Sequence, residues 1–503
     1  MAALRSTLTR GFTSAASSSS APSLTVANCN PHVVAAQYAV RGKLVLRANQ
    51  LEKELHSGST SKPFDEIVYC NIGNPQSLGQ QPITFVRQVL ALAAYPELML
   101  SAPSVGIPAD AVARAQKYLD GAPGGTGAYS HSKGIEVVRE EIADFMEARD
   151  GIKGNPENIF LTDGASPGVK MLLQMLIRDE GDGIMIPIPQ YPLYSASIAL
   201  CGGSQVDYYL NEATGWSMKL DEIERRLGEA RAKGINVRAL AVINPGNPTG
   251  QSMPKEDIAD VIRFCADENI VLLADEVYQE NIWERSLPFF SFRSVAAELG
   301  LLDNGLQLAS FHSVSKGFLG ECGRRGGYVE LSGFDEDVQD QLYKLASVNL
   351  CSNLDGQIAV GVMVNPPKPG DESYHKYNSE KTAILDSLKR RASIIVDALN
   401  GMEGISCNVS QGALYAFPAI ELPQAAVDHA NSLNMSPDLF YCLELLEATG
   451  VVVVPGSGFG QEEGTFHFRT TILPHEDQMK SVIGSMGSFH ESFLEKFRPS
   501  GRL

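Results

Sequence analysis

Five short apolar segments alternate with segments of helical periodicity, and a polar cluster rich in Gly or Pro follows each apolar segment. The predicted strands are residues 159–162, 184–188, 239–243, 270–274 and 306–311. Apolar strands that alternate with helices predict a mostly parallel α/β sheet with helices on both faces. The polar clusters then meet at the carboxyl ends of the strands, where open α/β sheets bind their ligands. The pattern therefore predicts an α/β fold with one ligand site at that edge.

The chain of 503 residues is longer than one hydrophobic core usually serves, so a large and a smaller domain are expected. A Pro- and Gly-rich link at 365–371 marks the boundary. We predict a large domain over 105–365 and a smaller α+β domain over 366–503. An N-terminal arm at 31–104 completes the smaller domain, which also contains a predicted helix at 375–400 and predicted strands at 451–454 and 466–471.

Composition excludes several classes of partner. The formal charge is −18 and no dense Lys/Arg run occurs, which argues against nucleic acid. No apolar run reaches the ~18 residues of a membrane span. The eight cysteines form no C-x-x-C pair, so neither a disulfide framework nor a metal site is predicted, and a reducing compartment is the simpler interpretation.

The first 30 residues differ from the rest of the chain. They contain Arg5, Arg10, seven serines and no acid, and the first carboxylate of the chain is Glu52. A basic, Ser-rich and acid-free leader is typical of an organelle transit peptide, and we predict the mitochondrial matrix. A plastid or the cytoplasm stays open. The C-terminal residues 501–503 only loosely resemble a peroxisomal signal.

The polar clusters offer what a phosphate-bearing aromatic aldehyde requires. Lys316 is the candidate for a covalent bond to the aldehyde, since an amine held among cations is partly neutral. Ser166 before Pro167 predicts a helix start with Ser166 as the N-cap residue. Backbone N–H groups at that start suit a phosphate. Ser313, Ser315 and one of Arg324 or Arg325 would complete a phosphate cup.

Other clusters suit the ring of such a cofactor and an amino-acid substrate. Tyr191 is placed to stack on the ring, and Asp275 at a strand end to keep its nitrogen protonated. Asn247 and Tyr278 are placed to contact the ring's phenolic oxygen, and Arg469 to bind a substrate carboxylate. Each residue alone has an ordinary structural explanation, such as a turn or a helix cap. Their order on successive strand ends favours the cofactor site.

Four motifs in this order make the resemblance explicit: NPGNPTG (244–250), ADEVY (274–278), SVSKG (313–317) and CGRRGGY (322–328). The chain resembles the fold-type I pyridoxal-phosphate aminotransferases from about residue 37 to its end. Longer strings resemble the alanine aminotransferase branch of that family. They are QYAVRG (37–42), FLTDGAS (160–166), PIPQYPLYSA (187–196), SKGFLGECGRRGGY (315–328), VVPGSGFGQ (453–461) and FHFRTTILP (466–474).

The resemblance implies roles for individual residues and a homodimer. Lys316 would bind pyridoxal 5′-phosphate covalently and move protons, and Asp275 and Tyr278 would assist it. The phosphate would be held by Ala165, Ser166, Ser313 and Arg325, with Arg324 peripheral. Substrate would be held by Gly73, Asn247 and Arg469. Tyr129, in GAYSHSKG (127–134), would reach the phosphate in the partner subunit, and Ser352 or Asn353 would approach the neighbouring site.

The implied activity is reversible transamination of L-alanine and 2-oxoglutarate to pyruvate and L-glutamate, ping-pong through pyridoxamine phosphate. The alternative is a glutamate–glyoxylate aminotransferase, a similar branch that also uses alanine. A lyase on the same scaffold would use the same lysine. A ligand-sensing regulator would need an appended DNA-binding domain, for which the leader offers no candidate. The sequence leaves open whether Cys322, inside the arginine-bearing loop, has a redox role.

Overall fold

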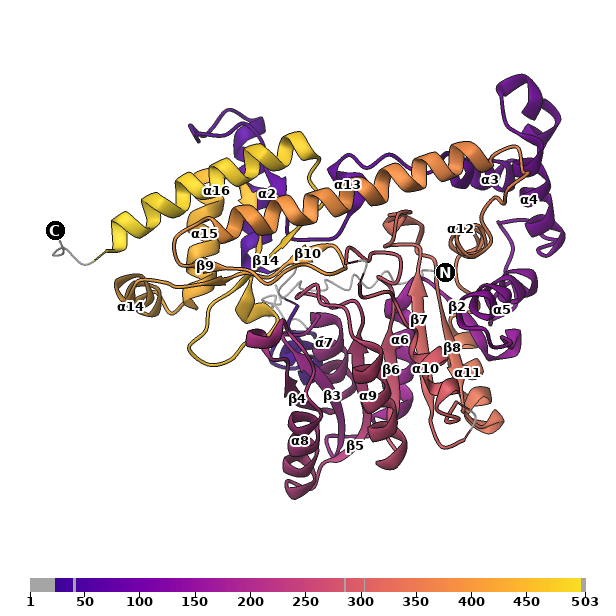
Figure 1. The fold of residues 1–503 in the computed structure, drawn as a ribbon, viewed down its shortest axis with the longest axis horizontal. Helices are drawn as coiled ribbons and strands as arrows, with labels where there is room; N and C mark the ends of the chain where they lie inside the picture. Colours follow the sequence, from indigo (N-terminus) through magenta and orange to yellow (C-terminus); the bar gives the residue numbers. More distant parts are fainter. Residues whose placement is uncertain (1–22, 39–41, 285, 303, 499–503) are drawn as a thin grey trace, which may run out of the picture.

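A seven-stranded sheet forms the centre of the larger part of the molecule (Figure 1). The computed structural model describes residues 23–38, 42–284, 286–302 and 304–498, so most of the predicted leader lies outside the described residues. The strand order is β2-β8-β7-β6-β5-β3-β4. The strands are β2 (Ile159–Thr162), β3 (Asp182–Ile188), β4 (Ser204–Tyr209), β5 (Asn236–Ile243), β6 (Val271–Asp275), β7 (Leu308–Ser313) and β8 (Gly327–Ser332).

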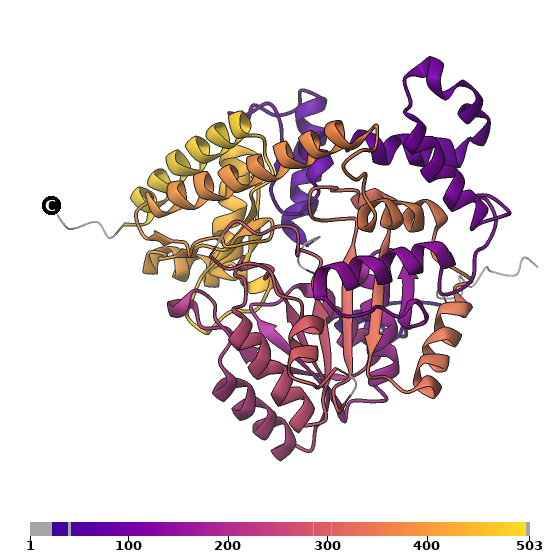
Figure 2. The same ribbon diagram turned by 45° about the vertical axis from the view of Figure 1, so that its right-hand side comes forward.

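Helices cover both faces of this sheet, because successive residues of each strand point to opposite faces. Leu273 packs in the core formed with α6 (Ala165–Leu176), α7 (Pro192–Cys201) and α11 (Glu336–Val348). Leu272, its neighbour, packs in the opposite core. The helices of that core are α8 (Leu220–Ala232), α9 (Lys255–Asp267) and α10 (Phe292–Glu298). Figure 2 shows the strands between the two layers.

A third core lies beside β2 and contains α3 (Thr84–Ala94), α4 (Ala109–Asp120), α5 (Glu136–Asp150) and α12 (Leu354–Val364). The short helix α1 (Pro31–Ala35) contacts α7. Short 3-10 helices occupy several connections. They are η2 (Pro75–Leu78), η3 (Pro96–Val105), η4 (Pro156–Asn158), η5 (Glu212–Thr214), η6 (Cys322–Arg324) and η7 (Gly456–Gly458).

The C-terminal part carries its own small sheets. β14 (Phe468–Thr471) pairs with β10 (Tyr415–Ala416) and β13 (Val454–Pro455), and β9 (Ile405–Ser406) pairs with β11 (Ala419–Ile420). The helices are α13 (Tyr374–Asn400), α14 (Gln424–Ser432), α15 (Pro437–Thr449) and α16 (Glu476–Phe497). The long helix α13 runs from α16 across to α3 (Figure 1).

The N-terminal segment returns to this C-terminal part. β1 (Val68–Tyr69) pairs in parallel with β12 (Val451–Val452), and α2 (Lys43–His56) contacts α15. The domain boundaries at residues 105 and 366 stay predictions. Among the described residues, no helix combines the length and the apolar character needed to cross a membrane.

The sheet is mostly parallel, as predicted, and the structure corrects four details. β8 runs antiparallel to both of its neighbours, and β4 was not predicted, because its residues alternate in burial and contain few aliphatic side chains. Residues 451–454 form parts of two strands, because β12 and β13 join different sheets. Ser166 does not cap α6. The N-cap residue is Gly164, and Ser166 lies in the first turn.

Candidate active site

A cavity of about 780 Å³ lies at the carboxyl edge of the sheet, between the strand ends and the C-terminal part. It brings together residues from segments that are far apart in the sequence. Of the predicted residues, it is lined by Gly73, Ala165, Ser166, Tyr191, Asn247, Asp275, Tyr278, Ser313, Ser315, Lys316, Arg324, Arg325 and Arg469. The predicted site residues therefore share one cavity, except Tyr129, Ser352 and Asn353.

Lys316 lies in the loop between β7 and β8. The Val314 N–H donates to the Gly326 carbonyl (3.1 Å), so the loop is closed at its base. Lys316 Nζ donates to the Gly73 carbonyl (3.1 Å) and lies 5.7 Å from the centre of the Tyr278 ring. No described carboxylate forms an ion pair with the Lys316 amine. The amine is thus held inside the cavity by one carbonyl and remains available for bond formation.

Asp275 is the last residue of β6 and is 4% exposed. Burial is the main reason that the pKa of Asp275 rises to about 6. The Val277 N–H, the Tyr194 hydroxyl and the charge of Lys316 offset this rise only in part. A carboxylate buried without a cation in contact is costly. The site therefore favours a ligand that brings a cationic nitrogen to Asp275.

The N-terminus of α6 and the Arg325 side chain form the other end of the cavity. Gly164 precedes α6 with a φ of 88°, a conformation that favours glycine. A Cβ on Gly164 would lie 2.5 Å from Arg325 Nη2, so a larger residue here would displace this guanidinium. Arg325 donates to the carbonyls of Asp163 (2.8 Å) and Cys322 (2.9 Å) and to no described carboxylate. Free N–H groups and this guanidinium together suit a phosphate.

Arg469 is 1% exposed, yet none of the described carboxylates pairs with it. Its guanidinium donates to Asn247 Oδ1 (2.9 Å) and to the Asn71 carbonyl. It lies close to two aromatic rings, 4.2 Å from the centre of Tyr415 and 4.6 Å from that of Phe459. Its Nε has no hydrogen-bond partner among the described residues. A buried cation in this state is suited to an incoming carboxylate.

Three tyrosines of the site were missed by sequence reasoning. Tyr415 lines the cavity from β10, Tyr38 lies 3.0 Å from the Tyr191 hydroxyl, and Tyr194 contacts Asp275. Tyr191 is the N-cap residue of α7, and Tyr194 follows it by three residues, in the first turn of that helix. That spacing was a usable signal. Tyr415 and Tyr38 follow no predicted strand, so nothing in the sequence pattern marked them.

Three residues implied by the resemblance lie elsewhere. Tyr129 is 77% exposed, on the surface of the described chain. Asn353 caps α12 by accepting from the Gly356 N–H (2.8 Å), and Ser352 is buried just before it. Cys322, by contrast, lines the cavity. Its thiol donates to the Ser315 carbonyl (3.1 Å) and lies 3.6 Å from the Gly73 carbonyl that Lys316 also contacts.

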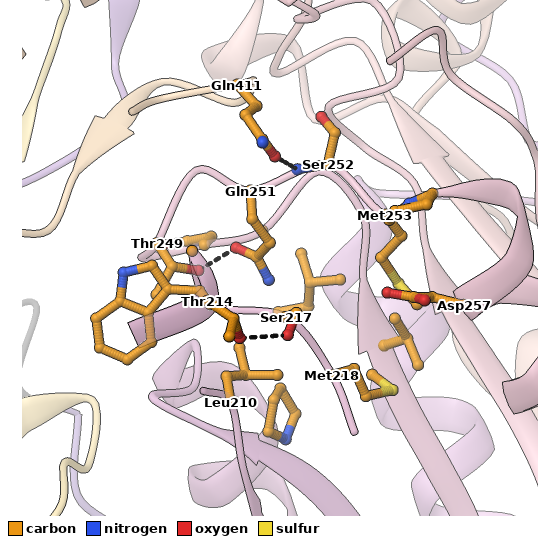
Figure 3. A pocket seen from close by; sticks show the side chains of 18 of the residues that line it. Leu210, Thr214, Ser217, Met218, Thr249, Gln251, Ser252, Met253, Asp257 and Gln411 are labelled. Atoms are coloured by element: carbon orange, nitrogen blue, oxygen red, sulfur yellow. Dashed lines mark hydrogen bonds between the residues drawn. The ribbon is translucent and has the colours of Figure 1, made fainter. Parts of the chain in front are cut away.

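A second, smaller cavity of about 110 Å³ is lined by residues of the loop that carries Asn247, among them Thr249, Gln251 and Ser252 (Figure 3). Polar contacts in this lining hold the loop. The Ser252 N–H donates to Gln411 Oε1 (2.9 Å), and the Thr249 hydroxyl donates to Gln251 Oε1. The Asn247 side chain accepts from Arg469, and these hydrogen bonds hold the loop that carries it.

Comparison with known proteins identifies the family. Residues 99–485 match aminotransferase class I and II. The chain belongs to this family. It is 56% identical to Alanine aminotransferase 1, mitochondrial, of Arabidopsis thaliana over 96% of this chain and 89% of the relative. It is 49% identical to Glutamate–glyoxylate aminotransferase 1 of the same plant, over 93% and 96% of the two chains.

The solved structures agree on the fold. An alanine aminotransferase from Pyrococcus furiosus superposes with a TM-score of 0.71 at 23% identity, covering 92% of this chain and 99% of the other. The fold is that of the fold-type I aminotransferases, as the motifs implied.

Aminotransferases of this family depend on pyridoxal 5′-phosphate, and the cavity fits that cofactor. Lys316 offers an amine without an ion-pair partner, and Asp275 a buried carboxylate that favours a cationic ring nitrogen. Gly164 leaves space for Arg325 beside the first N–H groups of α6, which suits the phosphate. These three features lie at separate points of one cavity, as a bound cofactor requires.

Proposed function

We propose that this chain catalyses the reversible transamination of L-alanine and 2-oxoglutarate to pyruvate and L-glutamate. The observation that carries the choice of alanine is the 56% identity to a relative named for that enzyme, against 49% to one named for glutamate and glyoxylate. The reaction type is supported by Lys316, Asp275 and the unpaired Arg469 in one cavity.

Each residue has a task in this proposal. Arg469 binds the α-carboxylate of the substrate with help from Asn247 and the Gly73 backbone, and so orients the α-carbon toward Lys316. The Lys316 amine removes the α-proton of the amino acid, and in the reverse half-reaction it returns a proton to the α-carbon. When bound, pyridoxal phosphate withdraws electrons from the α-carbon. Asp275 keeps its negative charge beside the ring nitrogen, which strengthens that withdrawal.

The remaining contacts hold the cofactor in the proposal. Ala165, Ser166, Ser313 and Arg325 bind the phosphate, and Tyr191 stacks on the ring. Asn247 and Tyr278 contact the phenolic oxygen of the ring. Arg324 plays a lesser part, because its guanidinium already lies near Glu321 (3.9 Å) and Asp355 (3.6 Å).

We also propose a homodimer in the mitochondrial matrix. Tyr129, exposed in the single chain, would contact the phosphate held by the partner subunit, and Ser352 or Asn353 would lie near it. The matrix is supported by the acid-free leader and by the mitochondrial name of the relative.

A comparison of two keto acids tests the reaction. With alanine or glutamate as amino donor, kcat/KM for pyruvate and 2-oxoglutarate should exceed that for glyoxylate by tenfold or more, about 1.4 kcal/mol. A preference for glyoxylate of that size would instead assign the chain to the glutamate–glyoxylate enzymes.

The Lys316→Ala variant is the control for the site. It should lose at least ~10³-fold in kcat, because both the covalent bond and the proton carrier are removed. The Lys344→Ala variant, at an exposed position on α11, should keep full activity. Equal activity in the two variants would refute the assignment of the site.

A further inference from the structure

We propose that Tyr415 is a further positioning residue of this site, which shares one proton with Lys316 and fixes the plane of the Arg469 guanidinium. The inference rests on the proposed transamination, since that reaction requires Lys316 to lose and regain a proton. Neither role was indicated by the sequence, because Tyr415 lies on a two-residue strand without a polar cluster.

The Tyr415 ring acts on Arg469. It is 3% exposed, and its centre lies 4.2 Å from the Arg469 guanidinium carbon, which is also 4.6 Å from the centre of Phe459. Cation–π contact is strong when both groups are desolvated. β10 and β14 carry the two residues, and the pairing of Tyr415 with Thr471 fixes the separation of the two strands. The ring therefore holds the guanidinium in one plane before a carboxylate arrives.

The Tyr415 hydroxyl acts on Lys316. It accepts from the Tyr278 hydroxyl at 3.4 Å, and a Cβ added to Gly73 would collide with it. The same Cβ would lie 3.1 Å from Lys316 Nζ. The hydroxyl and the amine thus both approach the same point beside Gly73, which places them in one part of the cavity. Tyr415 thus contacts Arg469, the proposed carboxylate-binding residue, through its ring, and its hydroxyl lies toward the Lys316 amine.

The surrounding charges favour a proton shared between these groups. Tyr415 and Tyr278 are equally buried, and burial raises the pKa of both. For Tyr278 the pKa stays well above the usual range. For Tyr415 the charges of Lys316 and Arg469 and the hydrogen bond from Tyr278 outweigh burial, and its pKa is lowered. Of the other groups that face it, Cys322 opposes this effect and Tyr191 is a neutral phenol.

The proton step balances without a co-reactant. An N–H bond of the Lys316 ammonium breaks as the O–H bond of Tyr415 forms, which converts an ammonium and a phenolate into a neutral amine and a phenol. The reverse transfer restores the charged pair. Because the anionic phenolate stabilises the ammonium, removing the Tyr415 hydroxyl should favour the neutral amine of Lys316.

Two substitutions separate the two tasks. Tyr415→Phe keeps the ring and removes the hydroxyl. We expect kcat for alanine to fall by roughly 10- to 100-fold with KM changed less than about threefold, and the acidic limb of the kcat profile to move to lower pH. Tyr415→Leu also removes the ring, and KM for alanine should rise by about tenfold or more. Tyr441→Phe, which loses a buried hydroxyl bonded to His490, should match the wild type.

A readout independent of activity is the ultraviolet absorbance of tyrosinate in the cofactor-free protein. The wild-type titration should show one phenolate that forms below about pH 10, and this signal should be absent from Tyr415→Phe. If the wild type shows no such phenolate, the inference is overturned whatever the variant does.

The kinetic outcomes keep the two proposals apart. A wild-type chain that transaminates, with a Tyr415→Phe variant of unchanged kcat and pH profile, overturns the inference about Tyr415 alone. A wild-type chain that does not transaminate any amino acid overturns the proposed function, and the tyrosinate titration still decides the charge on Tyr415.

Discussion

Asp275 is placed to bind a cationic ligand group, and this placement lowers the stability of the cofactor-free protein. The fold buries its carboxyl group at the end of β6, and the nearest donors are two weak hydrogen bonds of 3.4 Å. The folded chain therefore binds a proton at Asp275 more tightly than the unfolded chain does, since the pKa rises from 3.8 to about 6. A cationic ring nitrogen beside Asp275 would offset the free-energy cost of burying its negative charge.

The cost in stability of burying the ionised Asp275 carboxylate depends on pH. Between about pH 4 and pH 6, stability of the cofactor-free protein should fall as pH rises, because folding then requires loss of the Asp275 proton into a buried site. Asp275→Asn avoids this loss. At pH 8 the cofactor-free variant should be more stable by roughly 1–3 kcal/mol, a difference that disappears below pH 4.

Thermal unfolding of both cofactor-free proteins across this pH range measures the effect. Asp144→Asn, at an exposed position on α5, is the matched control and should change stability by less than about 0.5 kcal/mol. The loaded Asp275→Asn enzyme should nevertheless lose ~10²-fold or more in kcat. A variant that is less stable than the wild type at pH 8 would contradict this account of Asp275.

The two neighbouring arginines of the β7–β8 loop should differ in their effect on cofactor affinity. Arg325 points to the first turn of α6 and has no acidic partner, whereas Arg324 lies near two carboxylates. Arg325→Met should weaken pyridoxal phosphate binding by about 10- to 100-fold, the worth of a charged hydrogen bond. Arg324→Met should weaken it less than about threefold. Equilibrium dialysis measures both, and equal losses would refute the distinction.

At the scale of elements, a buried ion cluster joins two helices to the sheet directly behind Asp275. Arg149 at the end of α5 pairs with Asp150 (2.6 Å) and lies 3.7 Å from Glu276, the residue after Asp275. Arg293 on α10 pairs with Asp150 (3.3 Å) and lies 3.7 Å from Glu330 on β8. Burial raises the pKa of Glu276 and of Glu330 to about 7. These acids need both arginines to remain ionised.

Removing one arginine should therefore be costly. Arg149→Met leaves Asp150 and Glu276 with one cation fewer in a dry environment, and we expect a loss of ~3–5 kcal/mol in the free energy of unfolding. Arg225→Met, which breaks two exposed ion pairs on α8, should cost less than about 1 kcal/mol. Chemical denaturation of both variants at pH 7 tests the contrast. Similar losses would show that the buried cluster does not hold α5 to the sheet.

The whole molecule presents apolar side chains that the single chain leaves in solvent. They include Leu100 (89% exposed), Tyr129 (77%) and Val348 (77%). A contiguous patch of exposed apolar residues marks an interaction surface, whereas single ones are normal. Tyr129 is one of the three, and in the proposed homodimer, in which each subunit completes the other's site, the partner would cover it.

Mixing two defective variants tests shared sites. Lys316→Ala lacks the amine but keeps Tyr129, and Tyr129→Ala has the reverse defect. A mixed dimer should regain one complete site, so activity after mixing should exceed that of either variant alone and approach a quarter of the wild type for random pairing. Light scattering should give twice 54.3 kDa. No recovery from a mixture that is shown to be dimeric would refute a contribution of Tyr129 across the interface.

Most strands of the central sheet and the position of the cavity could be predicted from the sequence. Buried strands require continuous apolar runs, so five strands of the sheet were found from their composition, and their polar ends mark the cavity. β8 was missed because Gly327, Glu330 and Ser332 interrupt its apolar run, although the whole strand is buried. Tyr415 was missed because a two-residue strand leaves no periodic signal. The Ser166 cap was wrong because the helix begins at Ala165, after Gly164, whose φ of 88° favours glycine at the N-cap.

The closed loop between β7 and β8 has a consequence for engineering. Its base is tied by the hydrogen bond from Val314 to Gly326, and both the Lys316 amine and the Arg325 guanidinium project from the 11 residues between them. The loop is thus a compact segment whose two ends are held together by a backbone hydrogen bond. Transplanting it between family members should transfer both anchors together, while a length change inside it should alter their spacing and leave the sheet intact.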